Sequence, residues 1–72
     1  MNTDELEEVL AWLKGHNDDK EKVKRTELVE YIAKNYGYKE SYISVIILPI
    51  LKAKGLKMAH EKGCWRAYYD GD

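Results

Sequence analysis

The 72-residue chain contains no phenylalanine, one proline and one cysteine, Cys64. A single cysteine excludes an intramolecular disulfide and favours a reducing, intracellular setting. The longest apolar run, residues 45–51, is far shorter than the roughly 20 residues that a membrane-spanning helix needs. The N-terminal segment is acidic rather than basic, which is not the pattern of a signal peptide. We therefore expect a cytoplasmic protein that does not enter a membrane.

Catalytic and metal-binding patterns are also missing. His16 and His60 are isolated, and His60 together with Cys64 offers too few ligands for a four-coordinate structural metal site. The sequence has no serine-histidine-acid order, no glycine-rich phosphate loop and no paired carboxylates in apolar surroundings. Cys64 is interpreted as a small apolar residue of a strand. We expect no enzyme activity, no cofactor, no metal and no small-molecule substrate.

Charge is distributed unevenly along the chain, although the net charge is only −1. Residues 1–19 carry −5, residues 20–69 carry +6, and two aspartates near the end add −2. This division allows one basic face to meet a polyanion while the whole chain stays near neutrality. An evenly mixed, solvated surface is the alternative interpretation of the same charges.

Helical periodicity predicts two amphipathic helices, at about 4–14 and 26–36. Asn2 or Thr3 is expected to cap the first helix and Thr26 the second, because their side-chain oxygens accept bonds from amides of the first turn. Each helix presents one apolar stripe: Leu6, Val9, Leu10 and Leu13 in the first, and Leu28, Val29, Ile32, Ala33 and Tyr36 in the second. Trp12 is expected to pack over the edge of the first stripe.

The connections between helices differ in character. Residues 16–24 are polar and predict a loop, in which only Val23 offers a core contact or one rung of a sheet. Gly37 ends the second helix, because glycine tolerates a left-handed backbone at this position. About three residues then separate it from the next apolar segment, a spacing typical of a helix-turn-helix corner.

The segment SYISVIILPILKAKGL, residues 41–56, is the most apolar part of the chain. Its β-branched residues suit a strand, but residues 45–48 are consecutively apolar and do not alternate. The run continues into LKAKG, which is typical of a helix end with late lysines and a closing glycine. We therefore favour a helix over about 40–54, with a strand as the alternative.

As a helix, this segment carries two apolar stripes. The inward stripe contains Ile43, Ile47, Ile50 and Leu51, and a second stripe on nearly the opposite side contains Tyr42, Val45, Ile46 and Pro49. Leu48 lies between them. Pro49 removes a backbone hydrogen bond to the carbonyl of Val45, so we expect a kink near residues 45–49.

The last segment predicts a β-hairpin over about 56–69. The turn is HEKG, residues 60–63, and the returning strand alternates one set of side chains with another. Cys64, Arg66 and Tyr68 form the first set, and Trp65, Ala67 and Tyr69 the second. Both sets contain apolar residues, so the inward set stays open.

This order of elements resembles the winged helix-turn-helix family of DNA-binding domains. The resemblance is carried by residues 26–69, TELVEYIAKNYGYKESYISVIILPILKAKGLKMAHEKGCWRAYY. Its most specific part is LKAKGL, residues 51–56, which is similar to the family's leucine-x-x-x-glycine-leucine junction between recognition helix and wing. The resemblance implies one α+β domain over residues 1–72, with three helices and a C-terminal β-hairpin wing.

The resemblance also implies a function. In this family the third helix enters the major groove of duplex DNA and the wing touches the backbone or minor groove, commonly in transcription regulation. Matched by position, the DNA-binding residues are Lys24, Arg25, Thr26, Lys39, Ser41, Tyr42, Val45, His60, Lys62 and Arg66, with Glu61 and Gly63 also at the wing tip. A dimer would double the phosphate contacts and bury the second stripe.

The third helix departs from the family in one respect. Residues 39–56 contain no arginine, asparagine or glutamine, the side chains that form paired hydrogen bonds with bases. Tyr42 and Ser41 can bond to bases or phosphates, and Val45 can meet a thymine methyl group. We therefore expect weak direct readout of DNA sequence.

A protein-protein interaction module is the alternative function. Tyr42, Val45, Ile46 and Pro49 would then dock a protein partner, with Tyr38 at the rim, because exposed apolar patches mark partners and interfaces favour aromatic residues. The near-zero net charge suits this alternative. In a third interpretation the first helix covers this stripe and nothing binds there.

Overall fold

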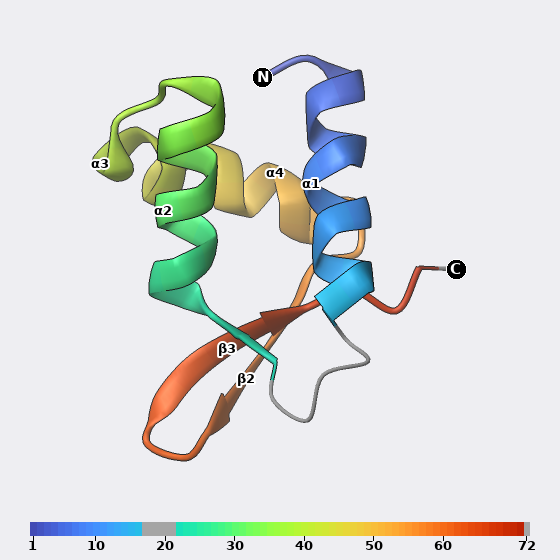
Figure 1. Ribbon diagram of the computed structural model, residues 1–72, viewed down its shortest axis with the longest axis vertical. Coiled ribbons are helices and arrows are strands. Elements are labelled where there is room, and N and C mark those ends of the chain that lie inside the picture. The colour runs from blue at the N-terminus through green and yellow to red at the C-terminus, as the bar shows by residue number, and fades with distance from the viewer. Residues whose placement is uncertain (17–21, 72) are drawn as a thin grey trace.

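The computed structural model describes residues 1–16 and 22–71, which form three helices and a three-stranded antiparallel sheet (Figure 1). This confirms the predicted α+β class. The first two helices are α1 (Thr3–His16) and α2 (Arg25–Tyr36). The strands are β1 (Val23–Lys24), β2 (Lys57–Glu61) and β3 (Cys64–Tyr68). Most of the predicted loop at 16–24 lies outside the described residues.

The third helix is continuous in sequence but has three parts: α3 (Glu40–Tyr42), a π-helical turn η1 (Ile43–Ile47) and α4 (Leu48–Ala53). The strand alternative for this segment is therefore wrong. Within the described ranges, no helix is both long enough and apolar enough to cross a membrane.

Helix α1 begins with a capping box. The Glu5 amide donates to Asn2 Oδ1 at 2.8 Å, and the Asn2 amide donates to Glu5 Oε1 at 3.2 Å. These reciprocal bonds satisfy amides that the first turn leaves without helical partners. Asn2 is thus the cap, as one of the two candidates predicted. The α1 stripe is buried, and Trp12 stacks on Tyr31 with ring centroids 4.0 Å apart.

Helix α2 begins one residue earlier than predicted. Lys24 occupies the N-cap position with an extended backbone, and no side chain caps the helix, so the prediction of Thr26 as cap was wrong. The reason is that Lys24 belongs to β1 and pairs with Arg66, so the strand leads directly into the helix. At the other end, Gly37 has a φ of 78° and donates its amide to Ala33, which confirms the predicted stop.

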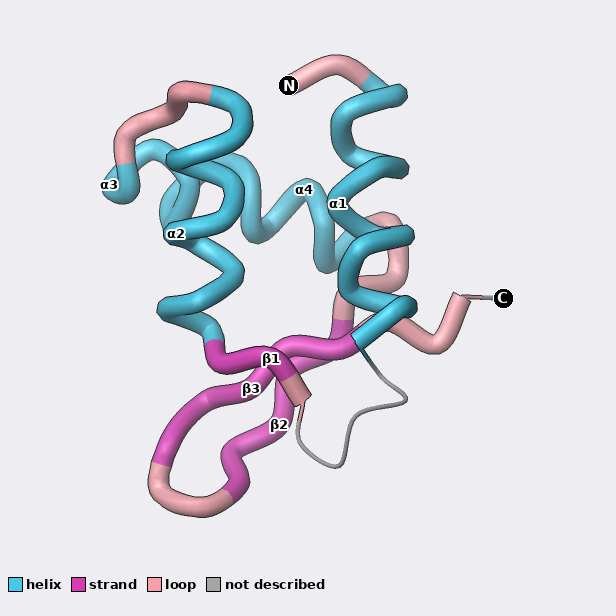
Figure 2. The backbone as a smooth tube through the Cα atoms, in the orientation of Figure 1, coloured by secondary structure: helices cyan, strands magenta, loops and turns pink. Residues whose placement is uncertain are grey.

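The sheet has the order β1-β3-β2, with β3 in the centre (Figure 2). Ala67 of β3 pairs with Val23 on one side and Met58 on the other. Val23 and Ala67 are buried in the core formed with the helices. The inward set of β3 is therefore the one that contains Ala67, and the proposed role of Val23 as core contact and sheet rung is confirmed.

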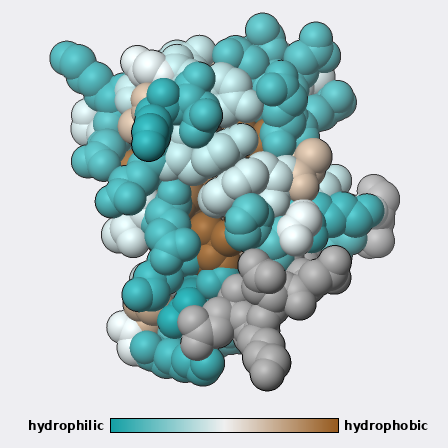
Figure 3. Space-filling view, viewed as in Figure 1, coloured by the Kyte–Doolittle hydropathy of each residue, from teal (hydrophilic) through white to brown (hydrophobic). Residues whose placement is uncertain are grey.

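The surface around α1 and α2 is largely hydrophilic. In the view of Figure 3, apolar residues gather in the hollow between these two helices, above the sheet. The apolar core itself unites all three helices with Val23, Leu56 and Ala67. The third helix lies behind α1 and α2 in Figure 1 and closes the core from that side.

The π-helical turn changes which residues of the third helix face the core. The Leu48 amide donates to the Ile43 carbonyl, five residues back, rather than to a carbonyl four residues back. One extra residue in a turn rotates everything after it by about 100° relative to a regular helix. Leu48 is therefore buried and Ile50 is 42% exposed, so the prediction of Ile50 as an inward residue was wrong.

Pro49 follows this turn directly. It lies in the first turn of α4 and has no amide hydrogen to donate to the Val45 carbonyl. A kink was expected near residues 45–49, and the structure has a π-helical turn at Ile43–Ile47, directly before α4. The chain thus passes the proline without ending the helix.

A Schellman motif joins the third helix to the hairpin. The Leu56 amide donates to the Leu51 carbonyl at 3.0 Å and the Gly55 amide to the Lys52 carbonyl at 3.1 Å. Gly55 has a φ of 118°, and an added Cβ would lie 3.0 Å from the Tyr69 ring. Leu51 and Leu56 are both buried beside the motif. The left-handed backbone at Gly55 and the burial of Leu51 and Leu56 explain the glycine and the two leucines of the LKAKGL pattern.

The register of the third helix can be tested by truncating Leu48 and Ile50 separately. Leu48→Ala removes a buried side chain and should lower the free energy of unfolding by about 2–5 kcal/mol. Ile50→Ala removes an exposed side chain and should change it by about 0.5 kcal/mol or less. Urea unfolding followed by circular dichroism measures both. The reverse order would show a regular helix without the π-helical turn.

Candidate nucleic-acid interface

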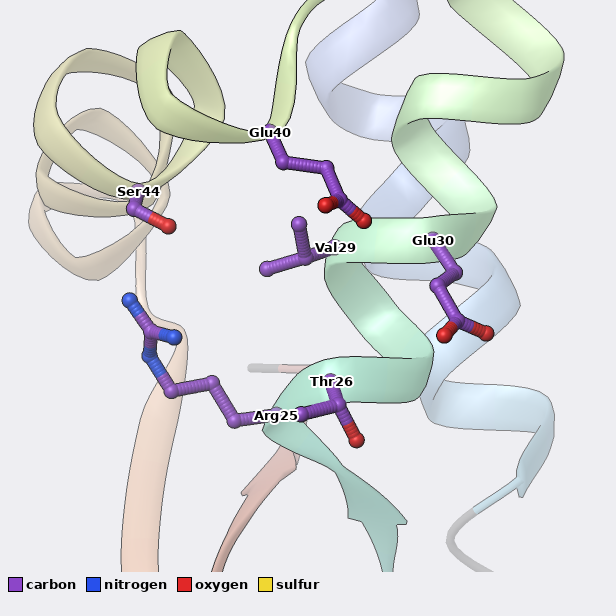
Figure 4. A pocket seen from close by; sticks show the side chains of 6 residues that line it. All are labelled: Arg25, Thr26, Val29, Glu30, Glu40 and Ser44. Carbon is purple, nitrogen blue, oxygen red and sulfur yellow. The ribbon is translucent and has the colours of Figure 1, made fainter.

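Arg25, the first residue of α2, lines three hollows in the surface, which we call the Arg25 hollows. The helix hollow has a volume of about 320 Å³ and is lined by Arg25, Thr26, Val29, Glu30, Glu40 and Ser44 (Figure 4). The middle hollow has about 240 Å³ and is lined by Arg25, Lys52, Met58 and Trp65. The wing hollow has about 340 Å³ and is lined by Lys24, Arg25, Thr26, His60, Gly63, Cys64 and Trp65.

Three parts of the fold meet at these hollows. The direct passage from β1 into α2 holds Lys24, Arg25 and Thr26 at one place, because Lys24 is paired with β3. The β2–β3 hairpin contributes Met58, His60 and Trp65, and the third helix contributes Ser44 and Lys52. In Figure 4 the Arg25 guanidinium extends from the start of α2 toward Ser44 on the third helix.

The charge of the hollows changes from one end to the other. Lys24, Arg25 and Lys52 line the two hollows beside the hairpin, and none of the residues that line these two is a carboxylate. The helix hollow instead contains Glu30 and Glu40. The two hollows beside the hairpin are therefore lined by cations alone among charged groups, whereas the helix hollow combines Arg25 with two carboxylates.

These cations are not engaged in the ion pairs of the described residues. The two ion pairs found there are Lys22–Glu61 at 3.1 Å and Lys57–Asp70 at 2.9 Å. Both are exposed, and each contributes little to stability. Lys24, Arg25 and Lys52 thus have no ion-pair partner among the described residues.

The structure brings together four of the predicted site residues: Lys24, Arg25, Thr26 and His60. Ser41, Tyr42 and Val45 lie exposed on the third helix, and Lys39 lies exposed just before it; none of the four lines an Arg25 hollow. Lys62 lies exposed in the hairpin turn between Glu61 and Gly63, with a φ of 53°.

Sequence reasoning missed Ser44, Lys52, Met58 and Trp65 as lining residues. Trp65 could have been found from the sequence, since it lies two residues before the inward Ala67 on β3 and therefore shares its face. Lys52 follows the π-helical turn, which changes the helical position of every residue after it, and it lines the middle hollow with Arg25.

Arg66 does not belong to the exposed surface. It was grouped with the DNA-binding residues, but it is only 5% exposed. Its Nη1 donates to the Lys22 carbonyl at 3.1 Å and its Nε donates to the Glu61 carbonyl at 3.3 Å. Arg66 is therefore a structural residue, and its buried guanidinium ties β3 to Lys22, just before β1, and to the end of β2.

The second apolar stripe of the third helix is exposed. Tyr42, Ile46 and Ile50 are 43%, 42% and 42% exposed and, with the π-helical turn between them, lie in one line along the helix. Val45 is 68% exposed and Pro49 is also exposed. Tyr38 stacks on Tyr42 with ring centroids 5.6 Å apart. The interpretation in which the first helix covers this stripe is therefore wrong.

Tyr36 of α2 is a titratable residue that lies outside these surfaces. Burial, with smaller contributions from Glu8 and Tyr31, raises the pKa of Tyr36 to about 12. Tyr36 is therefore protonated at neutral pH and donates to Glu8 Oε2 at 3.3 Å, a link between α2 and α1. Among residues 1–16 and 22–71, no group of three or more His, Cys, Asp or Glu side chains is arranged to hold a metal ion.

Comparison with known proteins identifies no relative. A scan against protein-family models gives no match, and neither the curated proteins nor the solved structures contain a match to this chain.

The structural role of Arg66 gives a testable prediction. Arg66→Ala removes two hydrogen bonds from a charged donor to partly buried carbonyls and should lower the free energy of unfolding by about 1.5–3 kcal/mol. Lys34→Ala, which removes an exposed charge near the end of α2, should change it by about 0.5 kcal/mol or less. Urea denaturation compares the two. Equal stability of the two variants would mean that Arg66 is not a structural residue.

Proposed function

We propose that this chain is a winged helix-turn-helix domain that binds duplex DNA, in transcription regulation. The third helix would be the recognition helix and the β2–β3 hairpin the wing. The observation that carries the proposal is the position of Arg25, where the start of α2, the third helix and the hairpin meet. The three cations of the two hairpin-side hollows face no carboxylate there, which suits a phosphate backbone.

Affinity in this proposal comes mainly from phosphates. Arg25, Lys24 and Lys52 supply charge beside the wing, and Lys39 and Lys62 add charge at the two ends of the surface. Ser41, Val45 and Pro49 on the outer face of the third helix offer no side chain for bidentate base recognition. Binding should therefore depend strongly on salt and only weakly on sequence.

The proposal predicts unequal roles for the cations that line the Arg25 hollows and for those that do not. Arg25→Ala and Lys52→Ala should each weaken binding to a labelled random duplex and reduce the slope of log affinity against log salt by about 1, the effect of one lost phosphate contact. Fluorescence anisotropy at several salt concentrations measures both quantities.

Lys34→Ala is the matched control, because it removes the same charge from an exposed residue that lines none of the Arg25 hollows. Its slope of log affinity against log salt should equal that of the unmodified chain. The proposal fails if all three variants lose the same small amount of affinity, since only net charge would then matter.

A second candidate function is protein interaction through the outer face of the third helix. The observation that favours it is the line of Tyr42, Ile46 and Ile50, flanked by Val45 and Pro49, on a helix with few charges at this face. Apolar patches of this kind mark interaction surfaces. A second copy of the chain is the simplest partner, and a dimer would also double the phosphate contacts of the first proposal.

This candidate predicts a change in mass. The double substitution Ile46→Ser and Ile50→Ser should convert a dimer into a monomer in sedimentation equilibrium, because it removes the centre of the apolar line. Ala53→Ser, an exposed change at the end of the same helix, should leave the dimer intact. An unmodified chain that sediments as a monomer at every concentration would rule out self-association through this face.

A further inference from the structure

We infer that Trp65 is a stacking platform for an unpaired base, and that Arg25 and Lys52 hold the phosphate of the same nucleotide. The inference rests on the proposed nucleic-acid binding. It identifies an unpaired base as the part of a nucleic acid that this surface recognises. It concerns the middle and wing hollows, which share Arg25 and Trp65.

The position of Trp65 in the sheet explains its exposure. It lies two residues before Ala67 along β3, so both side chains leave the sheet on the same face, that of the core. Ala67 lies under the helices and is buried, whereas Trp65 lies beyond their edge and is 54% exposed. The indole therefore continues the apolar face of the sheet into the two hollows.

The two tryptophans of the chain differ in their ring partners. Trp12 has a parallel neighbour, Tyr31, at an interplanar angle of 7°. The ring contact of Trp65 is with His60 at 73°, an edge arrangement, and no described residue stacks in parallel on its indole. A flat aromatic ligand can supply that missing parallel partner.

The other lining residues select the kind of aromatic ligand. Arg25 and Lys52 bring two cations to the middle hollow, and Lys24 with Arg25 brings two to the wing hollow. An aromatic ring beside fixed positive charge suits a nucleotide, whose base stacks and whose phosphate pairs with the cations. The middle hollow, about 240 Å³, is smaller than a typical ligand site, and the wing hollow, about 340 Å³, is at the lower end of that range, so the two together suit a single nucleotide.

A base inside a duplex cannot make this contact, because both of its faces are already stacked. An unpaired base can leave the helix and present a face to an aromatic side chain. Such stacking accepts any base, because every base has a π-face. This agrees with a third helix that offers few groups for sequence readout.

The first test compares a blunt duplex with the same duplex carrying one unpaired nucleotide. Anisotropy should show about tenfold tighter binding to the bulged DNA, from the reported strength of base–aromatic stacking. Trp65→Ala should remove this preference and keep binding to the blunt duplex, whereas Trp65→Phe should keep most of the preference. An equal affinity for the two DNAs, or a preference that survives Trp65→Ala, overturns the inference and leaves the proposed function intact.

The second test uses the fluorescence of one tryptophan at a time. In Trp12→Phe the remaining indole is Trp65, and bulged DNA should quench it more strongly than blunt duplex does. In Trp65→Phe the remaining indole is Trp12, stacked on Tyr31 between α1 and α2, and neither DNA should quench it. Equal quenching of Trp65 by both DNAs contradicts base stacking. Absence of binding to either DNA would sink both the inference and the proposed function.

Discussion

The hydrogen bond from the Leu48 amide to the Ile43 carbonyl is the constraint on which both candidate surfaces depend. By inserting one residue into a turn, it rotates the whole of α4 about its axis. Leu48 enters the core, Ile50 joins Tyr42 and Ile46 on the outside, and Lys52 reaches the hollow that contains Arg25 and Trp65. A regular helix of the same sequence would bury Ile50 and direct Lys52 away from Trp65. The π-helical turn therefore determines the surface chemistry of the third helix.

The hairpin side of the site depends on β1, a strand of only two residues. Val23 fills the core and pairs with Ala67, and Arg66 crosses to the Lys22 carbonyl. Because α2 begins at the next residue after Lys24, this small sheet rung fixes Arg25 relative to the hairpin. In the proposed function, the buried Arg66 would serve binding indirectly, by holding the hairpin in place while Arg25 presents its charge.

Much of the fold could be predicted from local rules. The periodicity of α1 and α2, the left-handed Gly37 and the LKAKGL junction each depend on a few neighbouring residues, and each is found in the structure. The errors arose where tertiary structure decides. Thr26 lost its role as a cap because β1 pairs with β3, and Ile50 changed sides because the helix changed register. In the candidate site, four residues could be predicted from their positions in the sequence: Lys24, Arg25, Thr26 and His60. The sequence alone suggests that Arg66 is an exposed cation, because its two carbonyl partners are known only from the structure.

The two proposed functions use different lines of the same helix, which makes them compatible. Lys52 and Ser44 lie on the line that faces Arg25, while Tyr42, Ile46 and Ile50 form the apolar line that lies outside the three Arg25 hollows. A nucleic acid bound on the hairpin side would contact cations and an exposed aromatic ring, and the hollows there contain Lys24, Arg25, Lys52 and Trp65. It gains little from the apolar line, whose burial instead favours association with a protein surface. A second copy bound along that line would bring a second set of cations to the same nucleic acid, so self-association would strengthen DNA binding through effective concentration without any new contact to DNA.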